Sequence, residues 1–382
     1  MNKHLKFLIL VLTLTTLYAC GSDDNSQPVE PVYPYGDNPQ ACAVPEQNEV
    51  NWNALNTSNC YRLSEYGLFS SIQNNNYLVN SPGIHYELNS SLFTDHARKY
   101  RYIFLPPNTQ MRYDDIEAFD FPLGSVIVKI FSLPQNTAEP NEQLIEIRLL
   151  IKRDDGWLPL TYHWHEEFSE AYLSITGKVV ESSIVHEGVG SNFDYLAPSR
   201  SQCSNCHIDD SSENIAFITP IGLKARHLNR SLDNESNQLR HWEQLGLLAG
   251  LPDDLSSIDT APDWRDTTAN LQDRAKAYLD INCGHCHSEG GAATLSGLRL
   301  EYWRKTLDYK HGVCNLAHGW RGGGFDIWPG NGEESSIPRR MGMTGAKDRM
   351  PPIGRSLIDQ EAIDLMIQWI NSMEYYACDG DH

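Results

Sequence analysis

The sequence predicts an α+β multidomain fold in which an N-terminal antiparallel β-sandwich or barrel-like domain precedes a mostly α-helical region. Three observations lead to this prediction. β-branched runs separated by turn signals occupy residues 63–190, helical apolar periodicity dominates after residue 264, and two Cys-x-x-Cys-His motifs lie in the second half. At 382 residues the chain is long enough for two or three domains with separate cores.

A signal peptide for export is predicted at the N-terminus. Lys3 and Lys6 flank the start of a short apolar run at residues 7–17, which is too brief to span a bilayer as a helix. The run leads into Leu-Tyr-Ala-Cys20-Gly, which resembles the lipobox of bacterial lipoproteins. The resemblance implies that residues 1–19 are removed and that the thiol of Cys20 is lipidated, whereas an ordinary secretory signal would be cut nearby.

Both alternatives export the protein, and the lipobox adds a lipid anchor as its only attachment to a membrane. Gly21 rather than Asp follows Cys20, which favours the outer membrane, with either its periplasmic or its cell-surface face as the final location. Residues 20–40 are rich in Pro, Asp, Asn and Ser, so we expect them to form a tether that need not fold.

Residues 41–190 are predicted to form the β-rich domain. Apolar, β-branched runs at 125–133, 143–151 and 157–168 are followed by shorter runs over 171–180, and Pro, Gly and Asp turn signals separate them. Runs of this length and spacing are typical of an antiparallel sandwich or barrel.

One pair of histidines in this domain could hold a metal ion. His163 and His165 lie two apart on a predicted strand and therefore share a face. A polar strand face is the more common role of such a pair, and no catalytic constellation accompanies it.

The two Cys-x-x-Cys-His motifs are Cys203-Ser-Asn-Cys206-His207 and Cys283-Gly-His-Cys286-His287. This pattern is the attachment signature of c-type haem. The two thiols add to the vinyl groups of a haem, and the histidine supplies a nitrogen to the iron. On a helical turn the three side chains share one face, so we predict two covalently attached haem c groups.

Three other interpretations of the motifs are less consistent with the sequence. Zinc would require four ligands in two close pairs, whereas these motifs lie 80 residues apart. A thioredoxin-like redox pair needs no adjacent histidine and expects a βαβ context. Structural disulfides do not explain why the same histidine follows both cysteine pairs.

The C-terminal part resembles class I cytochromes c over about residues 264–375. A predicted helix at 268–283 runs into the second motif, a long loop region leads to Met350-Pro-Pro, and an amphipathic helix covers 358–370. We therefore assign residues 191–262 to a first haem segment and 263–382 to a cytochrome c-like domain. The resemblance implies that the first and last helices cross, with Tyr278 or Leu279 near Trp369.

Met350 is the predicted sixth ligand of the second haem iron. The following proline disfavours helical backbone at Met350 and stiffens the loop, which can then aim a weak thioether at iron. Met341 and Met343, on a Gly-containing segment, are the rivals. Histidine–methionine ligation raises the reduction potential relative to bis-histidine ligation.

The sixth ligand of the first haem is left open by the sequence. No methionine lies between residues 111 and 341. His227 and His241 are the nearest downstream histidines, and Met111 would serve if the β-rich domain covered the haem. An open sixth position is the remaining alternative, and it would change the function.

Four cysteines remain after Cys20 and the four motif thiols are set aside. An even remainder in an exported protein predicts two disulfides. Proximity in the sequence pairs Cys42 with Cys60 and Cys314 with Cys378. A thiol or metal role for these residues has no supporting neighbour.

The whole pattern resembles a family of bacterial diheme c-type cytochromes. The resemblance implies two haems and electron transfer, without a settled substrate. His227 departs from the glutamine or asparagine that family members often carry at that position. The matching stretches span about residues 60–375 and are Tyr66-Gly-Leu-Phe69, Leu92-Phe-Thr-Asp-His-Ala97, Phe119-Asp-Phe-Pro122, Pro220-Ile-Gly-Leu-Lys-Ala-Arg226, Ala275–His287, Pro329-Gly-Asn331 and Arg349-Met-Pro-Pro352.

The predicted function is single-electron transfer between extracytoplasmic redox proteins. A net charge of −20 argues against nucleic acid or anionic lipid as the main partner and allows docking to a basic redox protein, although it also serves solubility. The alternative is a diheme enzyme, peroxidase-like or dehydrogenase-associated, with an open site at the first haem. A haem-based sensor is a third possibility that no feature favours, and no catalytic residue is assigned.

Overall fold

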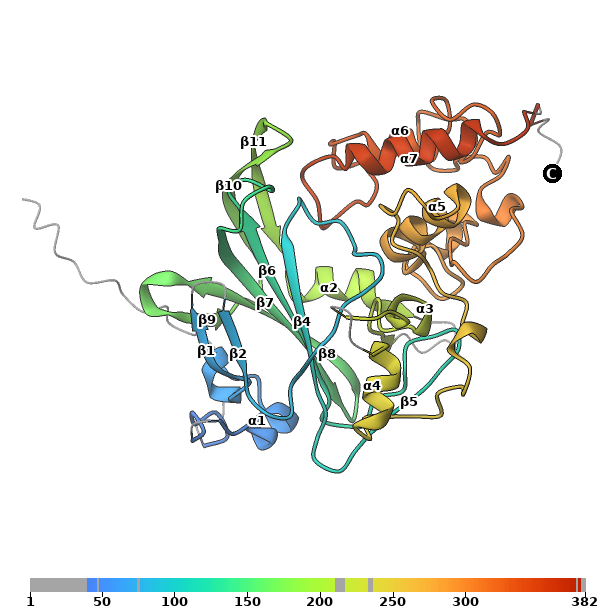
Figure 1. Ribbon diagram of the computed structural model, residues 1–382. Coiled ribbons are helices and arrows are strands. Elements are labelled where there is room, and N and C mark those ends of the chain that lie inside the picture. Colours follow the sequence, from blue (N-terminus) through green and yellow to red (C-terminus); the bar gives the residue numbers. More distant parts are fainter. Residues whose placement is uncertain are drawn as a thin grey trace, which may run out of the picture. The chain divides into compact units, whose positions relative to one another are not determined.

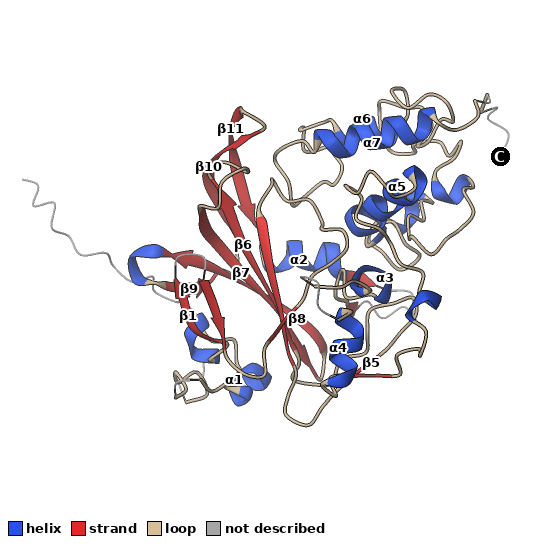
Figure 2. Cartoon of the chain, viewed as in Figure 1, coloured by secondary structure: helices blue, strands red, loops and turns tan. Residues whose placement is uncertain are grey.

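A six-stranded antiparallel sheet is the largest element of the structure (Figures 1 and 2). Its strands in spatial order are β3 (Ile84–His85), β4 (Arg98–Phe104), β6 (Val126–Pro134), β7 (Glu142–Arg153), β8 (Gly156–His165) and β9 (Glu170–Leu173). From β3 to β9, strands that follow one another along the chain are neighbours in the sheet, except that β5 (Met111–Arg112) does not join it. β5 pairs in parallel with β14 (Leu248–Ala249) instead.

This computed structural model describes residues 40–46, 48–73, 76–209, 217–232, 236–375 and 377–378, all of which belong to one compact unit. The predicted signal peptide at 1–19, Cys20 and all but the last residue of the predicted tether lie outside the described residues. Within the described ranges, no helix is both long enough and apolar enough to cross a membrane.

Smaller elements complete the structure. Three two-stranded sheets pair β1 (Phe69–Gln73) with β2 (Asn76–Val79), β10 (Lys178–His186) with β11 (Val189–Ala197), and β12 (Ile208–Asp209) with β13 (Phe217–Ile218). The α-helices are α1 (Trp52–Thr57), α2 (Arg200–His207), α3 (Ala225–Leu228), α4 (Gln238–Gln244), α5 (Leu271–Leu279), α6 (Ser336–Met341) and α7 (Gln360–Asn371).

The two faces of the central sheet pack against different layers. Val128 and Leu149 join a hydrophobic cluster with Leu55 of α1 and with residues of β1 and β2. Ile127 and Leu150, on the opposite face, join a second cluster with residues of α3 and α4. Because successive residues of a strand point to opposite faces, the almost continuous apolar runs of β6 to β8 follow from a sheet that is covered on both sides.

Helices α5 and α7 contact each other in the C-terminal part, as the resemblance to class I cytochromes c implied. Tyr278 and Leu279 of α5 belong to the same hydrophobic cluster as Trp369 of α7. The hydroxyl of Tyr278 also donates a hydrogen bond to Asp359 Oδ2 at 3.2 Å. Asp359 caps α7, because its other oxygen accepts from the backbone N–H of Ala362 at 3.3 Å.

The predicted α+β fold with a mostly α-helical second half is wrong. Among the described residues, 28 % lie in strands and 22 % in helices, so the protein is mostly β. Eleven glycines between residues 284 and 332 disfavour helix and leave turns and loops there; Gly312, for example, has φ 104°. The predicted sandwich or barrel is not formed by the described strands either, because helices and short hairpins cover the central sheet.

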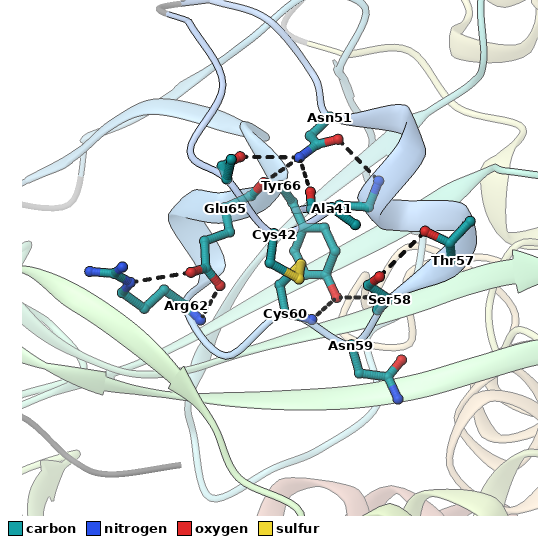
Figure 3. Close-up of a disulfide and its surroundings, with 12 residues drawn as sticks. Ala41, Cys42, Asn51, Thr57, Ser58, Asn59, Cys60, Arg62, Glu65 and Tyr66 are labelled. Atoms are coloured by element: carbon teal, nitrogen blue, oxygen red, sulfur yellow. Dashed lines mark hydrogen bonds and ion pairs between the residues drawn. A yellow bond between two sulfur atoms is a disulfide. The ribbon is translucent and has the colours of Figure 1, made fainter. Parts of the chain in front are cut away.

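Both predicted disulfides are present. Cys42 bonds to Cys60, and Cys314 bonds to Cys378. Figure 3 shows the first one beside Tyr66, whose hydroxyl accepts from the backbone N–H of Cys60 at 2.9 Å and donates to the carbonyl of Ser58 at 3.0 Å. This disulfide therefore joins the chain before α1 to the chain directly after it.

Candidate haem-binding site

The first motif lies on α2, directly after the hairpin of β10 and β11. Ser199 and Gln202 form a capping box that starts the helix, with the side-chain oxygen of Gln202 accepting from the Ser199 N–H at 2.9 Å. The helix rests on the central sheet, where Thr161 Oγ1 lies 3.9 Å from Cys203 Sγ. The sheet thus fixes the position of the first pair of thiols.

The second motif continues α5 through one turn of π-helix at Asp280–Gly284. Such turns are rare and occur frequently at functional sites. The backbone N–H groups of Cys286 and His287 then both donate to the carbonyl of Cys283, at 3.0 and 2.8 Å. The two thiols and the imidazole of the motif are therefore held on one tight turn.

Each motif histidine has its Nδ1 hydrogen-bonded, which leaves Nε2 for a metal. His207 Nδ1 donates to the carbonyl of Thr219 at 2.7 Å, because a carbonyl oxygen only accepts. His287 Nδ1 donates to Ser296 Oγ at 2.9 Å, because the Ser296 hydroxyl already donates to the carbonyl of Ala293. Metal-binding histidines commonly make a bond of this kind, which fixes the tautomer and the ring orientation.

Burial keeps both imidazoles neutral, as ligation requires. Burial lowers the pKa of His207 well below its usual value, with the Lys129 ammonium as the next cause. Burial also lowers the pKa of His287 to about 4, and the neighbouring charge of His285 acts in the same direction.

The structure brings the two motifs together although 80 residues separate them in the sequence. The Sγ atoms of Cys206 and Cys286 and a ring nitrogen of His285 all lie within 4.8 Å of one another. His285 Nδ1 is buried without a hydrogen-bond partner in the described structure. Sequence reasoning missed this meeting of the motifs and the position of His285, because no local signal reports a contact between distant segments.

A pocket beside the first motif is lined by two cations of the central sheet. Lys129 and Arg148 face Cys203, Cys206 and His207 across this pocket. Lys129 pairs with Arg148 across β6 and β7, so the two cations lie side by side on one sheet face. Burial lowers the pKa of Lys129 to about 8, and the positive charge of Arg148 adds to this effect.

The loop after Met350 reaches the same pocket, because Ile353 and Gly354 also line it. Arg355 organises this loop by donating hydrogen bonds to the carbonyls of Met341, Met343 and Met350, at 2.9, 2.9 and 2.8 Å. The backbone N–H of Met350 also donates to the carbonyl of Arg340 at 3.0 Å.

Met341 is buried in the same hydrophobic cluster as α5 and α7, so it serves packing. Met343 and Met350 are only partly buried. Both therefore stay candidates for the sixth ligand of the second haem, and the loop after Met350 additionally reaches the first motif.

The predicted candidates for the sixth ligand of the first haem do not line the pocket at the first motif. His227 is fully buried, and its Nε2 is bonded to Asp280, whose Oδ2 also accepts from Arg226 Nε at 2.8 Å. His241 is exposed on α4, and Met111 is buried in the cluster between the sheet and α4.

The other predicted metal pair also lacks a complete ligand set. The rings of His163 and His165 share a sheet face, as predicted, with centroids 5.3 Å apart. Within the described ranges, no third histidine, cysteine or carboxylate joins them in a group close enough to hold a metal. His165 lies 3.4 Å from Glu167 and packs on Tyr172, which is consistent with a polar strand face.

The residues at both motifs fit a covalently attached haem. Each motif offers two free thiols and one neutral imidazole whose Nδ1 is anchored. A metal ion shared by Cys206, His285 and Cys286 would use three donors from two motifs, and no fourth donor joins that group within the described residues. A structural zinc site usually has four ligands, so the donor set suits haem better.

No protein-family model matches the chain, and no curated protein or solved structure matches it either. The resemblance to diheme c-type cytochromes therefore depends on the motifs and stays a prediction.

Proposed function

We propose that the protein is an exported diheme c-type cytochrome that passes single electrons between extracytoplasmic redox proteins. The observation that supports this most directly is the meeting of the two Cys-x-x-Cys-His motifs at Cys206 and Cys286, with each motif histidine anchored through Nδ1. Haem iron supplies a reversible one-electron couple when it is bound.

The residues of the chain have separate roles in this proposal. Cys203, Cys206, Cys283 and Cys286 attach the two macrocycles, and His207 and His287 hold the metals. Because Cys206 and Cys286 meet, haem groups attached through these thiols would be held by adjoining segments of the chain, and they would supply the one-electron couple that the proposed function requires. Met350 is the proposed sixth ligand at the second motif, on the loop that Arg355 fixes.

The location follows the proposed chemistry. We propose cleavage of residues 1–19, lipidation of Cys20 and residence at the outer membrane through the lipid anchor alone. The oxidising conditions outside the cytoplasm agree with the two disulfides.

Mass spectrometry of the exported, denatured chain tests the attachment. We expect the mature mass to exceed that of the polypeptide and its lipid by two haem groups, with two irons per chain. The double variant Cys203→Ala/Cys206→Ala should lose one haem and keep the other. Ser204→Ala, which leaves both thiols of the motif in place, is the matched control and should keep two.

Two results would contradict the proposal. A colourless chain without added haem mass would remove the cofactor on which it depends. One zinc ion per chain, lost on Cys206→Ala and on Cys286→Ala alike, would instead assign the motifs to a shared zinc site.

A diheme enzyme is the second candidate, because none of His227, His241 and Met111 lines the pocket at the first motif. An enzyme needs a haem with an open or displaceable sixth position. Adding cyanide or carbon monoxide to the purified protein separates the two functions. Spectra that stay low-spin and unchanged support the electron carrier, whereas a high-spin haem that binds these ligands supports the enzyme.

A further inference from the structure

A second cavity lies beside β4, and we call it the β4 cavity. Its volume is about 440 Å³, which is within the usual range for a small-molecule site. None of the four motif cysteines lines it. It is lined by residues of β4 and of the segment before β4, by Pro134 and Thr137, by His186 at the end of β10, and by Trp264, Arg265 and Asp359. The polar and charged residues among them are Glu87, Ser91, Thr94, His96, Arg98, Lys99, Tyr100, Arg101, Thr137, His186, Arg265 and Asp359.

Two cations in this lining have no carboxylate partner. Arg101 is only 6 % exposed, and one of its terminal nitrogens donates to Ser91 Oγ at 2.9 Å. Lys99 Nζ donates to the backbone carbonyl of Ala97 at 3.2 Å. Neither side chain forms an ion pair with any carboxylate that the structure describes. A buried charge such as that of Arg101 is normally paired, and Lys99 beside it is half-buried.

Neighbouring positive charges raise the free-energy cost of holding Arg101 without a carboxylate partner. Arg101 pairs across the sheet with Lys129, and Lys129 pairs with Arg148, so three cations stand in a row. Like charges directly opposite each other destabilise a sheet. Glu146 accepts a hydrogen bond from Arg148. Its negative charge therefore balances Arg148, at the other end of the row, and not Arg101.

The acidic side chains of the cavity are engaged with other groups. Glu87 forms an ion pair at 3.5 Å with Arg230, which is not part of the lining, and its charge also acts on Arg101 without a direct bond between the two. Asp359 caps α7 and accepts from Tyr278. The charge of Asp95, outside the lining, also acts on Lys99. Its Oδ1 accepts from the N–H groups of Ser356 and Leu357 at 2.7 and 2.6 Å. The cavity is left with an excess of positive charge.

The two remaining cations of the lining already have partners. Arg98 lies 3.2 Å from Glu142, and Arg265 lies 2.9 Å from Glu361 while stacking on Trp264. The rings of His96 and His186 stack with centroids 4.0 Å apart, and His186 Nδ1 lies 3.0 Å from the hydroxyl of Thr137. These groups form polar walls around the two unpaired cations.

We infer that the β4 cavity binds a small oxyanion, a carboxylate or phosphate compound, held by Arg101 and Lys99. The two side chains are two residues apart on one strand and so leave the same sheet face about 7 Å apart. One dianion can bridge them, with the Ser91 hydroxyl as a further donor. The site is separate from the cysteine motifs, so the inference does not depend on haem attachment.

Calorimetry and thermal unfolding of the purified full chain test this site, with inorganic phosphate and succinate as probes. At least one probe should bind and raise the melting temperature as its concentration rises, because a ligand of the folded state stabilises it. Sodium chloride at matched ionic strength should not reproduce the shift. Arg101→Gln and Lys99→Gln should each weaken binding by about tenfold or more, because each removes a charge-assisted bond.

Arg112→Gln is the matched control, because it removes a cation of β5 that is exposed and paired with Asp120 outside the cavity. It should bind the probes like the unaltered protein. Without a probe, the two cavity variants should be at least as stable as the unaltered protein, since each removes an uncompensated charge. If one of the two cavity variants does not fold, the other cavity variant alone is compared with the control.

Two outcomes would overturn the inference. The first is that neither probe binds; if Arg101→Gln then also shifts a haem midpoint potential, these cations would be assigned to a haem propionate. The second is that both cavity variants bind as tightly as the control.

Discussion

The central sheet and the segments that carry the two motifs differ in what orders them. Strands β6, β7 and β8 pair along most of their length and are buried on both faces, so backbone hydrogen bonds and apolar packing hold them. Between the second motif and α7, the backbone hydrogen bonds of the described residues belong to turns, short helices and isolated bridges rather than to a strand ladder. Apolar packing also contributes there, and single polar side chains such as Asp280 and Arg355 each add bonds to several groups.

This difference indicates which substitutions should destabilise each region. Removing one side chain from a sheet leaves its backbone ladder intact. Removing Asp280 leaves Arg226 and His227 buried without their partner and frees the backbone N–H of Tyr302, which donates to Asp280 Oδ1 at 2.8 Å. A polar centre of this kind concentrates the stability of a loop-rich region in few residues.

The largest effect on stability is expected from Asp280→Ala. Breaking a buried ion pair on one side costs about 3–5 kcal/mol, because the remaining charge stays buried. Urea unfolding should show this loss. Asp120→Ala, which breaks the exposed pair with Arg112, is the matched control and should cost less than about 1 kcal/mol. Equal losses of stability in the two variants would show that the buried ion pair of Asp280 contributes no more than an exposed one.

The loss of folding stability on removing a disulfide should be larger for the disulfide that closes the longer loop. The Cys314–Cys378 bond closes 64 residues and the Cys42–Cys60 bond closes 18, for which loop-closure entropy gives about 4 and about 3 kcal/mol. Paired serine variants, Cys314→Ser/Cys378→Ser and Cys42→Ser/Cys60→Ser, compared by urea unfolding measure the difference. A larger loss at Cys42 and Cys60 would show that native packing around Tyr66 outweighs the entropy of the loop.

Acid should destabilise the protein through buried neutral histidines. Burial lowers the pKa of His311 to about 4 from 6.5, and both of its ring nitrogens lack partners within the described structure. Between these values the unfolded chain binds a proton that the folded chain does not, so stability falls as pH falls. This histidine should contribute a loss of about 2 kcal/mol between pH 7 and pH 5.

His311→Leu should make the stability less dependent on pH in this range. Urea unfolding at pH 7 and pH 5 is the measurement. His241→Leu, which removes an exposed ring of α4, is the control. If His311→Leu and His241→Leu both keep the pH dependence of stability of the unaltered protein, His311 is not its source.

The smallest effect on stability is expected from Met350→Ala, at below about 1 kcal/mol, because Met350 is only partly buried. Its spectroscopic effect should be clear. The near-infrared band of a thioether bound to ferric iron should disappear, and the reduction potential should fall. Met343→Ala is the control, and loss of the band in that variant alone would assign the ligand to Met343.

The sequence predicted those parts of the structure that local patterns determine. The apolar runs at 125–133 and 143–151 became β6 and β7 within three residues at each end, and the predicted helix at 358–370 became α7. Leu239, Trp242, Leu245 and Leu248 have the spacing of one face of an amphipathic helix, but α4 ends at Gln244. Leu245 is exposed after the helix, and Leu248 lies in β14, which pairs with β5.

The contact between the two Cys-x-x-Cys-His motifs could not be predicted in this way. The meeting of Cys206 with Cys286 and the position of His285 depend on how α2 and α5 pack, which no short pattern encodes. The amount of helix was overestimated because the two predicted helices at 268–283 and 358–370 were taken to represent the whole second half of the chain. Glycines and polar side chains order that part of the chain without helix.

The closeness of Cys206 and Cys286 has a consequence for how the chain matures. Two thiols this near to each other in an oxidising compartment can form a disulfide bond, which would take one cysteine from each motif at once. Porphyrin attachment at either motif removes this risk, since a thioether cannot be oxidised to a disulfide. Under the proposed function, cofactor loading must therefore come before the final closure of the chain, and a cell that loads cofactor too slowly should accumulate a cross-linked, colourless product.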